Sequence, residues 1–579
     1  MRIWFFEDVQ RLELERTQLE ALGRSMQWLK ATSWGIDNGL HIDATIQAHG
    51  HDYHIRLTYP NIFPYAPPTV CPQLFEEKWS THQYPDGTLC LEWGSDNWQP
   101  NISGAQVLES AYNLLHTENP LGSQNEIIAP SRHKLSLGQE LRNKYSRFYI
   151  GKELAEYLLD LPNDAEGTLK FSIVHQSDSW LVIVEQIQLD ESLSYEDASI
   201  PKGVRGSSEK PRKGLFSTTR LINTDFDNIE QIKEALHQTT GTQNCLSEID
   251  SDENISGLIL IDSNEKIHFF FLPVVDEGKI LPFYPVISDN NQVVSRLPFD
   301  QQNLSDKSVA IVGLGSIGSR VALSLARMGV SKFLLVDEDV FLPENVCRHS
   351  LDWNNIGEHK VNAVAHKLSL ISANIEVDVS KLHLVGQEST SSFSAILSRL
   401  AHYDLIINAT ADKKVFNLTT AIATSYSRHL IWAEVFTGGF GGIVARSRPE
   451  QDPEPHLMKA AYHEYTSANP VPKLAITENY TAFDTEQERV LSASDADVGV
   501  IANHTARFAI DTLLENETST FPYSMYLIGL SKAWVFKAPF HTIPIDTSNL
   551  PVSQKTEPPS QELVSEHFAF LENLIKDKQ

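Results

Sequence analysis

Cysteine is scarce in this sequence, and the spacing of the few that occur does not suggest a metal site. The chain of 579 residues has four, Cys71, Cys90, Cys245 and Cys347, and no two of them form a Cys-x-x-Cys pair. A four-thiolate zinc site would therefore lack its usual spacing. So few cysteines in so long a chain do not make a disulfide framework, which fits a reducing cytosol.

Long apolar runs and a net positive charge are also missing. The longest apolar stretches, such as IHFFFLPVV from Ile267, fall far short of the ~20 residues that span a bilayer. Near the N-terminus, Glu7 and Asp8 interrupt the chain before an apolar run of signal-peptide length can form. The formal net charge of −28 repels nucleic-acid phosphates and anionic lipids. We therefore expect a soluble, cytoplasmic protein that binds neither nucleic acid nor membranes.

The length and composition predict three or four folding units of ordinary globular character, since 41% of the residues are hydrophobic. The pattern of apolar residues divides the chain into three blocks, over residues 1–150, 151–295 and 296–579. The first block combines an N-terminal helical pattern, strand-like runs such as LHIDATIQA, a proline-rich turn region and further helical patterns, so we expect an α+β domain. The fold class of the whole chain is thus α/β with several domains.

The second and third blocks differ in their patterns. The second is rich in strand-like runs, such as WLVIVEQIQL and KIHFFFLPVV, and we expect a β-rich domain without a chemical motif. Its polar, basic insertion IPKGVRGSSEKPRKG is expected to be a mobile surface loop, with partner docking as the alternative. The third block alternates apolar strand runs with helical patterns, which predicts a Rossmann-like domain with a mainly parallel sheet, helices on both faces and a C-terminal tail.

A glycine-rich turn joins a strand to a helix early in the third block. Residues 309–337 give a buried strand, a Gly-x-Gly-x-x-Gly turn at Gly313, Gly315 and Gly318, a helix, and a second strand that ends at Asp337. Glycines let the backbone approach a phosphate, the helix N-terminus attracts an anion, and the acid can accept hydrogen bonds from ribose hydroxyls. This pattern predicts a nucleotide site without specifying the nucleotide.

Three later residues decide between a dinucleotide and ATP. Arg348, in ENVCRHSL, and Lys360, in IGEHK, add two cations, and the strand-like run DLIINATAD ends near Asp412. A dehydrogenase does not need two further cations and a late carboxylate. An adenylating enzyme needs them, because the charge of the triphosphate must be neutralised and Mg²⁺ must be held while a carboxylate attacks the α-phosphorus. The sequence therefore favours ATP and Mg²⁺.

Residues 305–420 resemble the adenylating domain of the ubiquitin-activating superfamily, which includes the sulfur-carrier adenylyltransferases of thiamine and molybdopterin synthesis. Such domains usually form homodimers that exchange an arginine across the interface, and Arg296, in VVSRLPF, is a candidate for it. The resemblance also implies nucleotide-binding roles for five residues: a ribose contact for Asp337, phosphate contacts for Asn345, Arg348 and Lys360, and Mg²⁺ binding for Asp412.

The first block holds a cysteine in a distinctive setting. The segments LTYPNIFPYAPPTV and HQYPDGTLCLEWGSDNWQPNISGAQVLESAYNLL resemble the strand, proline turn, catalytic-cysteine loop and next helix of the ubiquitin-conjugating fold. This points to Cys90, because a thiol presented after a Pro-Asp-Gly turn can accept an acyl group as a thioester and pass it to an amine. We interpret Cys71, in its apolar run, as a buried packing residue.

The His-Pro-Asn tripeptide that is usual in the ubiquitin-conjugating family is missing here. Its asparagine lies eight residues before the cysteine and helps to stabilise the oxyanion, and His82 stands at that position. His82 could donate a hydrogen bond to the oxyanion, a role worth ~3 kcal/mol in other enzymes, or it could be a solvent-facing loop histidine. Asp96 is a weaker candidate, for orienting the incoming amine.

The activating half lacks a cysteine in the expected place. The segment VLSASDADVGV is similar to the superfamily's Gly-Cys-Ser-Asp type segment, with Ala493 where the cysteine would stand. Either the chain is an engineered inactive form, or it hands the adenylate directly to Cys90, or this placement is wrong; we favour the first. Cys347, within the phosphate-contacting stretch, is interpreted as structural, and Cys245 is left unassigned.

The order of the two sites resembles the bacterial fusion enzymes of CBASS anti-phage operons, in which a ubiquitin-conjugating-like domain precedes a linker domain and an adenylating domain. The resemblance implies that the C-terminus of a cGAS-like nucleotidyltransferase is adenylated with ATP and Mg²⁺, carried on cysteine and conjugated to a target lysine. Two alternatives stay open: a sulfur-carrier adenylyltransferase in which Cys90 is inert, and a non-catalytic interaction protein in which both folds are relics.

Overall fold

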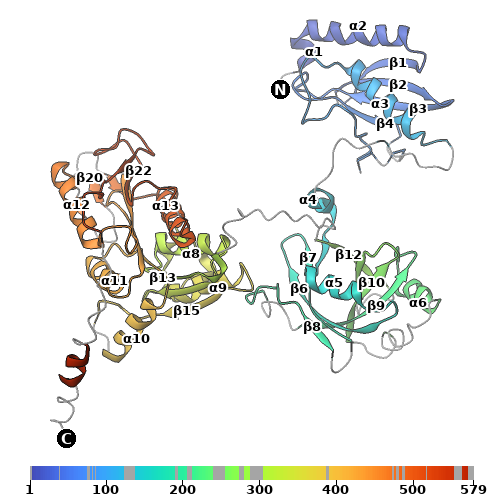
Figure 1. Cartoon of the computed structure of the whole chain (residues 1–579). Helices are drawn as coiled ribbons and strands as arrows, with labels where there is room; N and C mark the ends of the chain where they lie inside the picture. The colour runs from blue at the N-terminus through green and yellow to red at the C-terminus, as the bar shows by residue number, and fades with distance from the viewer. Residues whose placement is uncertain are drawn as a thin grey trace. The chain divides into compact units, whose positions relative to one another are not determined.

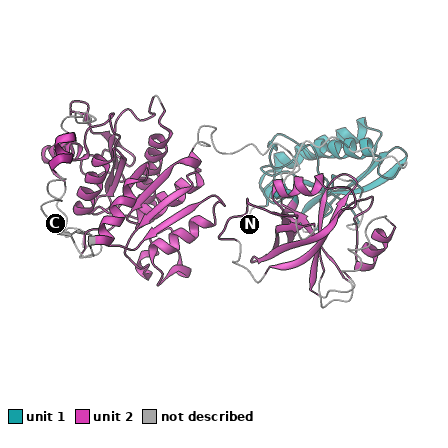
Figure 2. Ribbon diagram, turned by 60° about the horizontal axis from the view of Figure 1, so that its bottom comes forward, with its two compact units in different colours: residues 1–140 teal, residues 141–579 magenta. Residues whose placement is uncertain are grey.

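The structure is a computed structural model of the chain, drawn in Figure 1. The chain divides into two compact units, residues 1–140 and 141–579, which Figure 2 distinguishes by colour. Cys245, Arg296 and the centre of the basic insertion lie outside the described residues. The structure describes the whole chain apart from residues 1–2, 38, 75–78, 81, 85, 123–128, 130–136, 190–192, 205–210, 239–248, 250–253, 273–278, 287–303, 387–389, 472–474, 477–481, 485–488, 517, 553–563 and 571–579.

The first unit packs helices on an antiparallel sheet. The four strands pair in sequence order, and the alternating apolar residues of β2 bury Ile42 and Ile46 in one core with Val107 and Leu108 of α3. This is the α+β arrangement expected of the first block; its ubiquitin-conjugating identity stays a prediction. The elements are α1 (Trp4–Glu7), α2 (Val9–Ser25), β1 (Leu29–Ile36), β2 (Leu40–Ala48), β3 (His51–Thr58), β4 (Thr69–Pro72), α3 (Gly104–Glu118) and α4 (Leu137–Glu140).

The second unit begins with a sheet that closes on itself, because β5 pairs with both β12 and β7. The predicted β-rich character of the second block is confirmed. The compact first unit ends before β5, so residues 146–149 lie in this sheet and not in the first domain, where the sequence pattern placed them. The elements are η1 (Leu141–Asn143), β5 (Ser146–Tyr149), α5 (Lys152–Asp160), β6 (Glu166–His175), β7 (Trp180–Gln188), β8 (Ser194–Glu196), β9 (Arg212–Leu221), α6 (Ile229–His237), β10 (Ile255–Asp262), β11 (Ile267–Phe271) and β12 (Leu281–Pro285).

The rest of the second unit is built on a mixed sheet of order β15-β14-β13-β16-β17-β18-β22-β23. Strands β15 to β17 in that order are parallel, as predicted, and β18, β22 and β23 add an antiparallel extension. The elements are β13 (Ser308–Val312), α8 (Ser316–Arg327), β14 (Lys332–Val336), η3 (Pro343–Asn345), η4 (Trp353–Asn355), α9 (Lys360–Ser369), β15 (Glu376–Ser380), α10 (Thr390–Ala401), β16 (Leu405–Asn408), α11 (Lys413–Ser425), β17 (His429–Val435), β18 (Gly441–Ser447), α12 (Pro455–Ala468), β19 (Ala475–Ile476), β20 (Ala482–Asp484), β21 (Arg489–Leu491), α13 (Asp495–Leu514), β22 (Met525–Gly529) and β23 (Thr542–Pro544).

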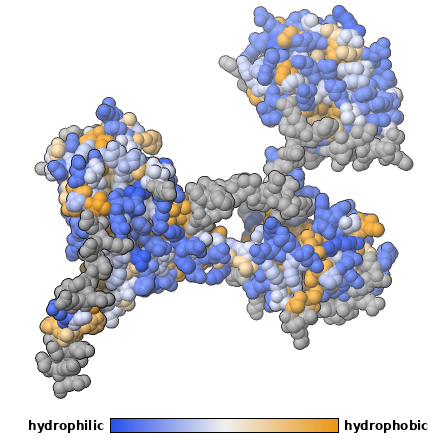
Figure 3. Space-filling view, in the orientation of Figure 1, coloured by the Kyte–Doolittle hydropathy of each residue, from blue (hydrophilic) through white to orange (hydrophobic). Residues whose placement is uncertain are grey.

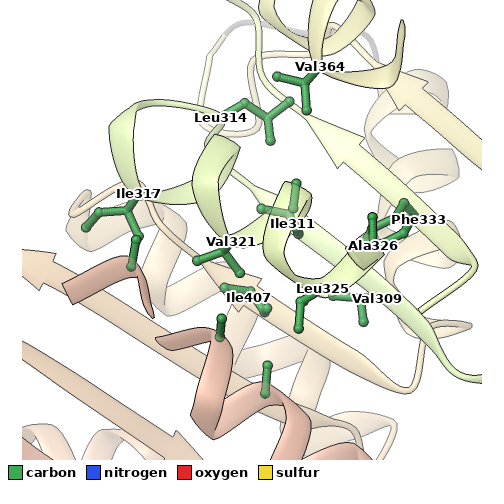
Figure 4. Packing of buried hydrophobic residues seen from close by; sticks show 14 of the residues in the cluster. Val309, Ile311, Leu314, Ile317, Val321, Leu325, Ala326, Phe333, Val364 and Ile407 are labelled. Carbon is green, nitrogen blue, oxygen red and sulfur yellow. The ribbon is translucent and has the colours of Figure 1, made fainter. Parts of the chain in front are cut away.

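Two separate cores cover the two faces of this mixed sheet. Along β13, Val309 and Ile311 point into one core with α8, α9 and α13, as Figure 4 illustrates for part of it. Ala310 and Val312 point into the other, with α10, α11 and α12. Strand β13 is therefore buried on both faces, which explains why its sequence is continuously apolar. The surface face drawn in Figure 3 is mainly hydrophilic, in keeping with this burial.

None of the helices within the described residues has the length and apolar character needed to cross a membrane.

A buried arginine fastens the antiparallel extension of the sheet to α13. Arg446 of β18 is fully buried, and its guanidinium lies 2.5 Å from the carboxylate of Asp511 and 4.8 Å from the ring centroid of Phe508. It also donates to the hydroxyl of Ser519. A buried charge is tolerated only with such partners. Burial by itself raises the pKa of Asp511, but hydrogen bonds from Arg446, Ser519 and Thr520 outweigh it and lower this pKa from 3.8 to about 2.

This pair predicts a defined acid sensitivity. Because the pKa of Asp511 in the folded protein lies below its unfolded value, the stabilisation is complete above the unfolded value and is lost as the pH falls toward 2. It amounts to about 2 kcal/mol. Asp511→Asn should lower the free energy of unfolding by about 3–5 kcal/mol at neutral pH, since it leaves the buried charge of Arg446 without its carboxylate partner. Urea titrations over a pH series should also show that this part of the acid dependence is lost.

The exposed ion pair of Glu20 with Arg24 provides the control. Glu20→Gln should cost under about 1 kcal/mol and leave the acid dependence unchanged. An equal acid dependence in Asp511→Asn and the parent chain would contradict the assignment.

Candidate nucleotide site and candidate thiol site

A cavity of about 380 Å³ lies where the parallel strands β13, β14, β16 and β17 end. Because the carboxyl ends of parallel strands meet at one edge of a sheet, the residues that follow each strand converge there. The structure therefore brings together residues that are far apart in the sequence. The sequence-predicted residues that line this cavity are Gly313, Gly315, Asp337, Arg348, Lys360, Asp412 and Ala493.

The three glycines of the turn differ in what the absence of a side chain allows. Gly313 has a φ of +87°, which side chains rarely adopt. A Cβ on Gly318 would lie 1.9 Å from the carbonyl oxygen of Gly313, so this residue allows α8 to pack against the turn. Gly315 precedes the first residue of α8, and a Cβ on it would meet no atom within 4 Å. Its backbone is thus open to a ligand at the N-terminus of α8.

Asp337 follows β14 and is only 8% exposed. Its Oδ2 accepts a hydrogen bond from the amide of Leu314 at 2.6 Å, and its Oδ1 accepts from the amide of Asp339 at 2.9 Å. Burial raises the pKa of Asp337, while Lys360 and these amides act in the opposite direction. The carboxylate therefore fixes the glycine turn to β14, besides facing the cavity where a ribose contact is expected.

The two predicted cations, Arg348 and Lys360, both line the cavity. The ammonium of Lys360, the first residue of α9, lies 2.7 Å from Oδ2 of Asp339, and the residue is 8% exposed. The guanidinium of Arg348 donates from Nη1 to the hydroxyl of Ser492 at 2.8 Å. Both side chains line the cavity, so they can neutralise phosphate charge there.

Asp412 caps the N-terminus of α11. Its Oδ1 accepts from the amides of Lys414 at 2.6 Å and Val415 at 3.1 Å, which leaves Oδ2 without a hydrogen bond from any described residue. Nowhere in the described part of the chain do three or more His, Cys, Asp or Glu side chains form a metal-binding group. One carboxylate nevertheless fits Mg²⁺, since this ion usually takes one or two protein carboxylates together with phosphate oxygens.

Two of the predicted nucleotide residues that the structure describes, Asn345 and Gly318, do not line the cavity. Asn345 uses its Oδ1 to accept from the amide of Leu342 at 2.9 Å, within η3. Gly318 contacts the turn instead of the cavity, and Arg296 lies outside the described residues.

Ala493 lies in the wall of the cavity, directly before α13, and is 8% exposed. Gly439, with a φ of +70°, packs so closely on it that a Cβ there would lie 2.7 Å from the Cα of Ala493. Ser494 caps α13, and Asp495 pairs with Arg320 of α8. The position that we predict to correspond to the family cysteine thus lines the candidate nucleotide site.

Two polar residues of this site were not predicted: the buried His349, which contacts the glycine turn, and the half-buried Glu434, which lines the cavity. His349 is 8% exposed; its Nε2 donates to the carbonyl oxygen of Leu314 at 2.7 Å, and its Nδ1 accepts from the amide of Leu351 at 3.1 Å. Burial lowers the pKa of His349 to about 4, so the ring is neutral. Its only sequence signal is its place next to Arg348.

The second missed residue is Glu434, which lines the cavity near the end of β17. Burial raises the pKa of Glu434, and the nearby cations Lys459 and Lys413 oppose this. An acid within the apolar strand sequence HLIWAEVF was the signal that could have identified it.

The candidate thiol lies in a loop of the first unit. Cys90 is half-buried, and its amide donates to the carbonyl oxygen of His82 at 2.7 Å. Cys71 is also half-buried, not fully buried as predicted, and its sulfur contacts the hydroxyl of Thr88 at 3.5 Å. The exposed Cys347 donates to the carbonyl oxygen of Glu344 at 3.3 Å.

His82 does not face solvent, because its side chain is only 14% exposed. Its Nε2 lies 2.7 Å from the carbonyl oxygen of Ala129 and 3.8 Å from the carboxylate of Glu118. The ring therefore ties the cysteine loop to the segment after α3. An oxyanion role for His82 stays a prediction, as does the orienting role of the exposed Asp96.

The glycine turn yields a paired stability prediction. Gly318→Ala should destabilise the second unit by about 1–3 kcal/mol, because its methyl group overlaps the carbonyl of Gly313. Gly315→Ala should leave the melting temperature almost unchanged, because nothing occupies the space that its methyl group enters. Thermal unfolding of both variants tests this, and equal melting temperatures would contradict the packing role of Gly318.

Two family models match the chain. The model of the ThiF family matches residues 289–533, and the model of a domain observed between E2 and E1 domains matches residues 167–280. These ranges fall largely within the third and second blocks expected from the sequence.

Among curated proteins, the ubiquitin-like modifier-activating enzyme 5 of Drosophila simulans is 31% identical over 158 residues, covering 26% of this chain and 38% of that protein. The ATP-dependent ubiquitin transferase-like protein Cap2 of Vibrio cholerae is 33% identical over 128 residues, covering 21% and 20%. The chain thus spans well under half the length of these relatives. Among solved structures, E. coli MccB with ATP has a TM-score of 0.33 and 16% identity, over 44% of this chain and 69% of that one.

The chain accordingly contains a ThiF-family domain, preceded by a domain of the kind observed between E2 and E1 domains.

Proposed function

We propose that this chain activates the carboxyl terminus of another protein with ATP and then carries the acyl group on Cys90. One observation carries the first half: a single cavity holds the glycine turn, the cations Arg348 and Lys360, and the carboxylate Asp412. Two cations and a separate acid in one cavity suit a triphosphate with its metal ion better than a nicotinamide dinucleotide. The ThiF-family domain supports the same choice.

In the proposed first step, a carboxylate oxygen of the acyl donor attacks the α-phosphorus of ATP, the bond to the β-phosphate oxygen breaks, and pyrophosphate leaves. The turn at Gly315 and the N-terminus of α8 bind the phosphates, while Arg348 and Lys360 balance the charge that develops on them. Asp337 orients the ribose. Mg²⁺, when bound at Asp412, would supply further charge neutralisation.

In the second step, the sulfur of Cys90 attacks the acyl carbon and AMP leaves, which gives a thioester. An amine of a target lysine then displaces the sulfur and forms an amide. Two features support this relay: the helices packed on an antiparallel sheet in the first unit, and the following domain of the kind observed between E2 and E1 domains. No cysteine follows Cys347 in the sequence, so we propose that Cys90 takes the acyl group directly from the adenylate unless Ala493 replaces a native cysteine.

The proposed acyl donor is the C-terminus of a cGAS-like nucleotidyltransferase, and the enzyme is proposed to act as a cytoplasmic homodimer through its adenylating domain, with Arg296 reaching across. The Cap2 relatives, named ATP-dependent ubiquitin transferase-like proteins, support a protein substrate.

A sulfur-carrier adenylyltransferase with an inert Cys90 is the second candidate. The alanine at position 493, in the cavity wall, favours it, because an enzyme that only makes adenylates needs no thiol there.

The nucleotide half of the proposal predicts a strong effect of one charge. In Asp412→Asn the asparagine can still cap α11, so the stability should change little. The negative charge is lost, so the rate of ATP–pyrophosphate exchange should fall by about 100-fold or more. The acyl donor in this assay is a purified cGAS-like nucleotidyltransferase with an intact C-terminus. Asp352→Asn removes an exposed partner of Lys367 outside the cavity and should leave exchange unchanged. Full exchange in Asp412→Asn would refute the metal role.

The thiol half predicts a separate loss. Cys90→Ala should keep ATP–pyrophosphate exchange and abolish an ATP-dependent adduct that thiols cleave, as seen on denaturing gels. Cys347→Ala, at an exposed cysteine, should keep both. Ala493→Cys should add a second adduct if that position once held a thiol. Exchange without any adduct on the parent chain would favour the sulfur-carrier candidate.

A further inference from the structure

The cysteine loop brings a tyrosine hydroxyl to the sulfur of Cys90. Backbone contacts form a turn here: the amide of Tyr84 donates to the carbonyl oxygen of Thr88 at 2.8 Å, and Gly87 has a φ of +86°. Gln83 and Leu89 form an antiparallel bridge across this turn. The hydroxyl of Tyr84 consequently lies 3.9 Å from Sγ of Cys90 and donates a hydrogen bond to it, a separation within reach of the large sulfur atom.

Both groups remain accessible to a substrate. Tyr84 is 46% exposed, and Cys90 is half-buried. His82, in contrast, has its Nε2 at 2.7 Å from the carbonyl oxygen of Ala129.

We propose that Tyr84 is a catalytic residue of the thiol site and that its hydroxyl stabilises the sulfur of Cys90 whenever that sulfur carries negative charge. Charge-assisted hydrogen bonds are about twice as strong as neutral ones, so the contact strengthens when the thiol loses its proton. The inference rests on the proposed function for the reaction it serves, whereas the hydrogen bond is a property of the free chain.

The stabilisation acts twice in the relay. During loading, the thiol releases its proton to solvent, the thiolate attacks the acyl carbon of the adenylate, and AMP leaves with the electron pair of the broken C–O bond. During discharge, the lysine amine attacks the thioester carbon and loses a proton to solvent, and the C–S bond breaks with its electron pair on sulfur. Sulfur is anionic at the start of the first step and at the end of the second, and the hydroxyl of Tyr84 is in place at both points.

Other titratable groups, on the cysteine loop and on the elements that it contacts, must stay constant in a test. They are His82, Asp86, Glu92 and Asp96 on the loop, Cys71 on β4, and Glu118 at the end of α3. Replacing tyrosine by phenylalanine leaves all of them unchanged and removes a single oxygen atom. Because Tyr84 is nearly half exposed, we expect this substitution to change the stability of the fold by no more than about 0.5 kcal/mol.

The experiment measures alkylation of Cys90 by iodoacetamide in the full chain, over a pH series, with mass spectrometry resolving each cysteine peptide. The thiolate is the reacting form, so Tyr84→Phe should slow alkylation about threefold near neutral pH and displace the profile to higher pH. Cys347 in the same sample is the internal reference and should react unchanged. Tyr65→Phe, at an 80% exposed tyrosine of the same unit, should leave the Cys90 profile where it is.

A Cys90 profile that is identical in Tyr84→Phe and the parent chain would overturn the inference. So would equal slowing at Cys90 and Cys347, since a hydrogen bond to one sulfur cannot affect the other. A displaced profile in a chain that forms no ATP-dependent adduct would uphold the hydrogen bond from Tyr84 to the sulfur of Cys90 but remove the proposed relay, so the two failures are distinguishable.

Discussion

The hydrogen bond from the amide of Leu314 to Asp337 is the interaction on which the candidate nucleotide site depends. Leu314 is the central residue of the glycine turn, and its carbonyl oxygen is held in turn by the neutral ring of His349. Both backbone polar groups of Leu314 are therefore hydrogen-bonded to buried side chains: its amide donates to Asp337, and its carbonyl oxygen accepts from His349. The turn is fixed before any ligand arrives, which is the condition for electrostatic preorganisation.

Most of the site geometry could be predicted because it follows from strand order. Gly313 and Asp337 come directly after apolar runs that predict buried strands, and Asp412 follows a third such run by a few residues. The carboxyl ends of parallel strands lie at one edge of the sheet. Arg348 and Lys360 were expected from a resemblance, and the structure places them at the same edge. The contributions of these residues to catalysis stay predictions.

The rest depends on contacts that no local pattern contains. His349 and Glu434 are polar groups whose roles arise from burial by elements distant in the sequence, so their residue type alone could not identify them. Asn345 was expected at the phosphates, but its side chain closes a short turn with Leu342 instead. His82 was weighed as a donor to the oxyanion or a solvent-facing residue, and neither possibility anticipated its contact with Ala129, which lies far along the chain.

The closure of the middle sheet by β5 governs how this protein can be divided into fragments. Strand β5 spans only Ser146–Tyr149, yet it joins the edges of β12 and β7. A fragment that started at the boundary suggested by the sequence, residue 151, would lose this strand and expose two unpaired backbone edges, which invite intermolecular pairing and aggregation. A fragment that keeps the β-rich domain and the ThiF-family domain intact therefore has to begin before residue 146, for example at residue 141, where the second compact unit starts.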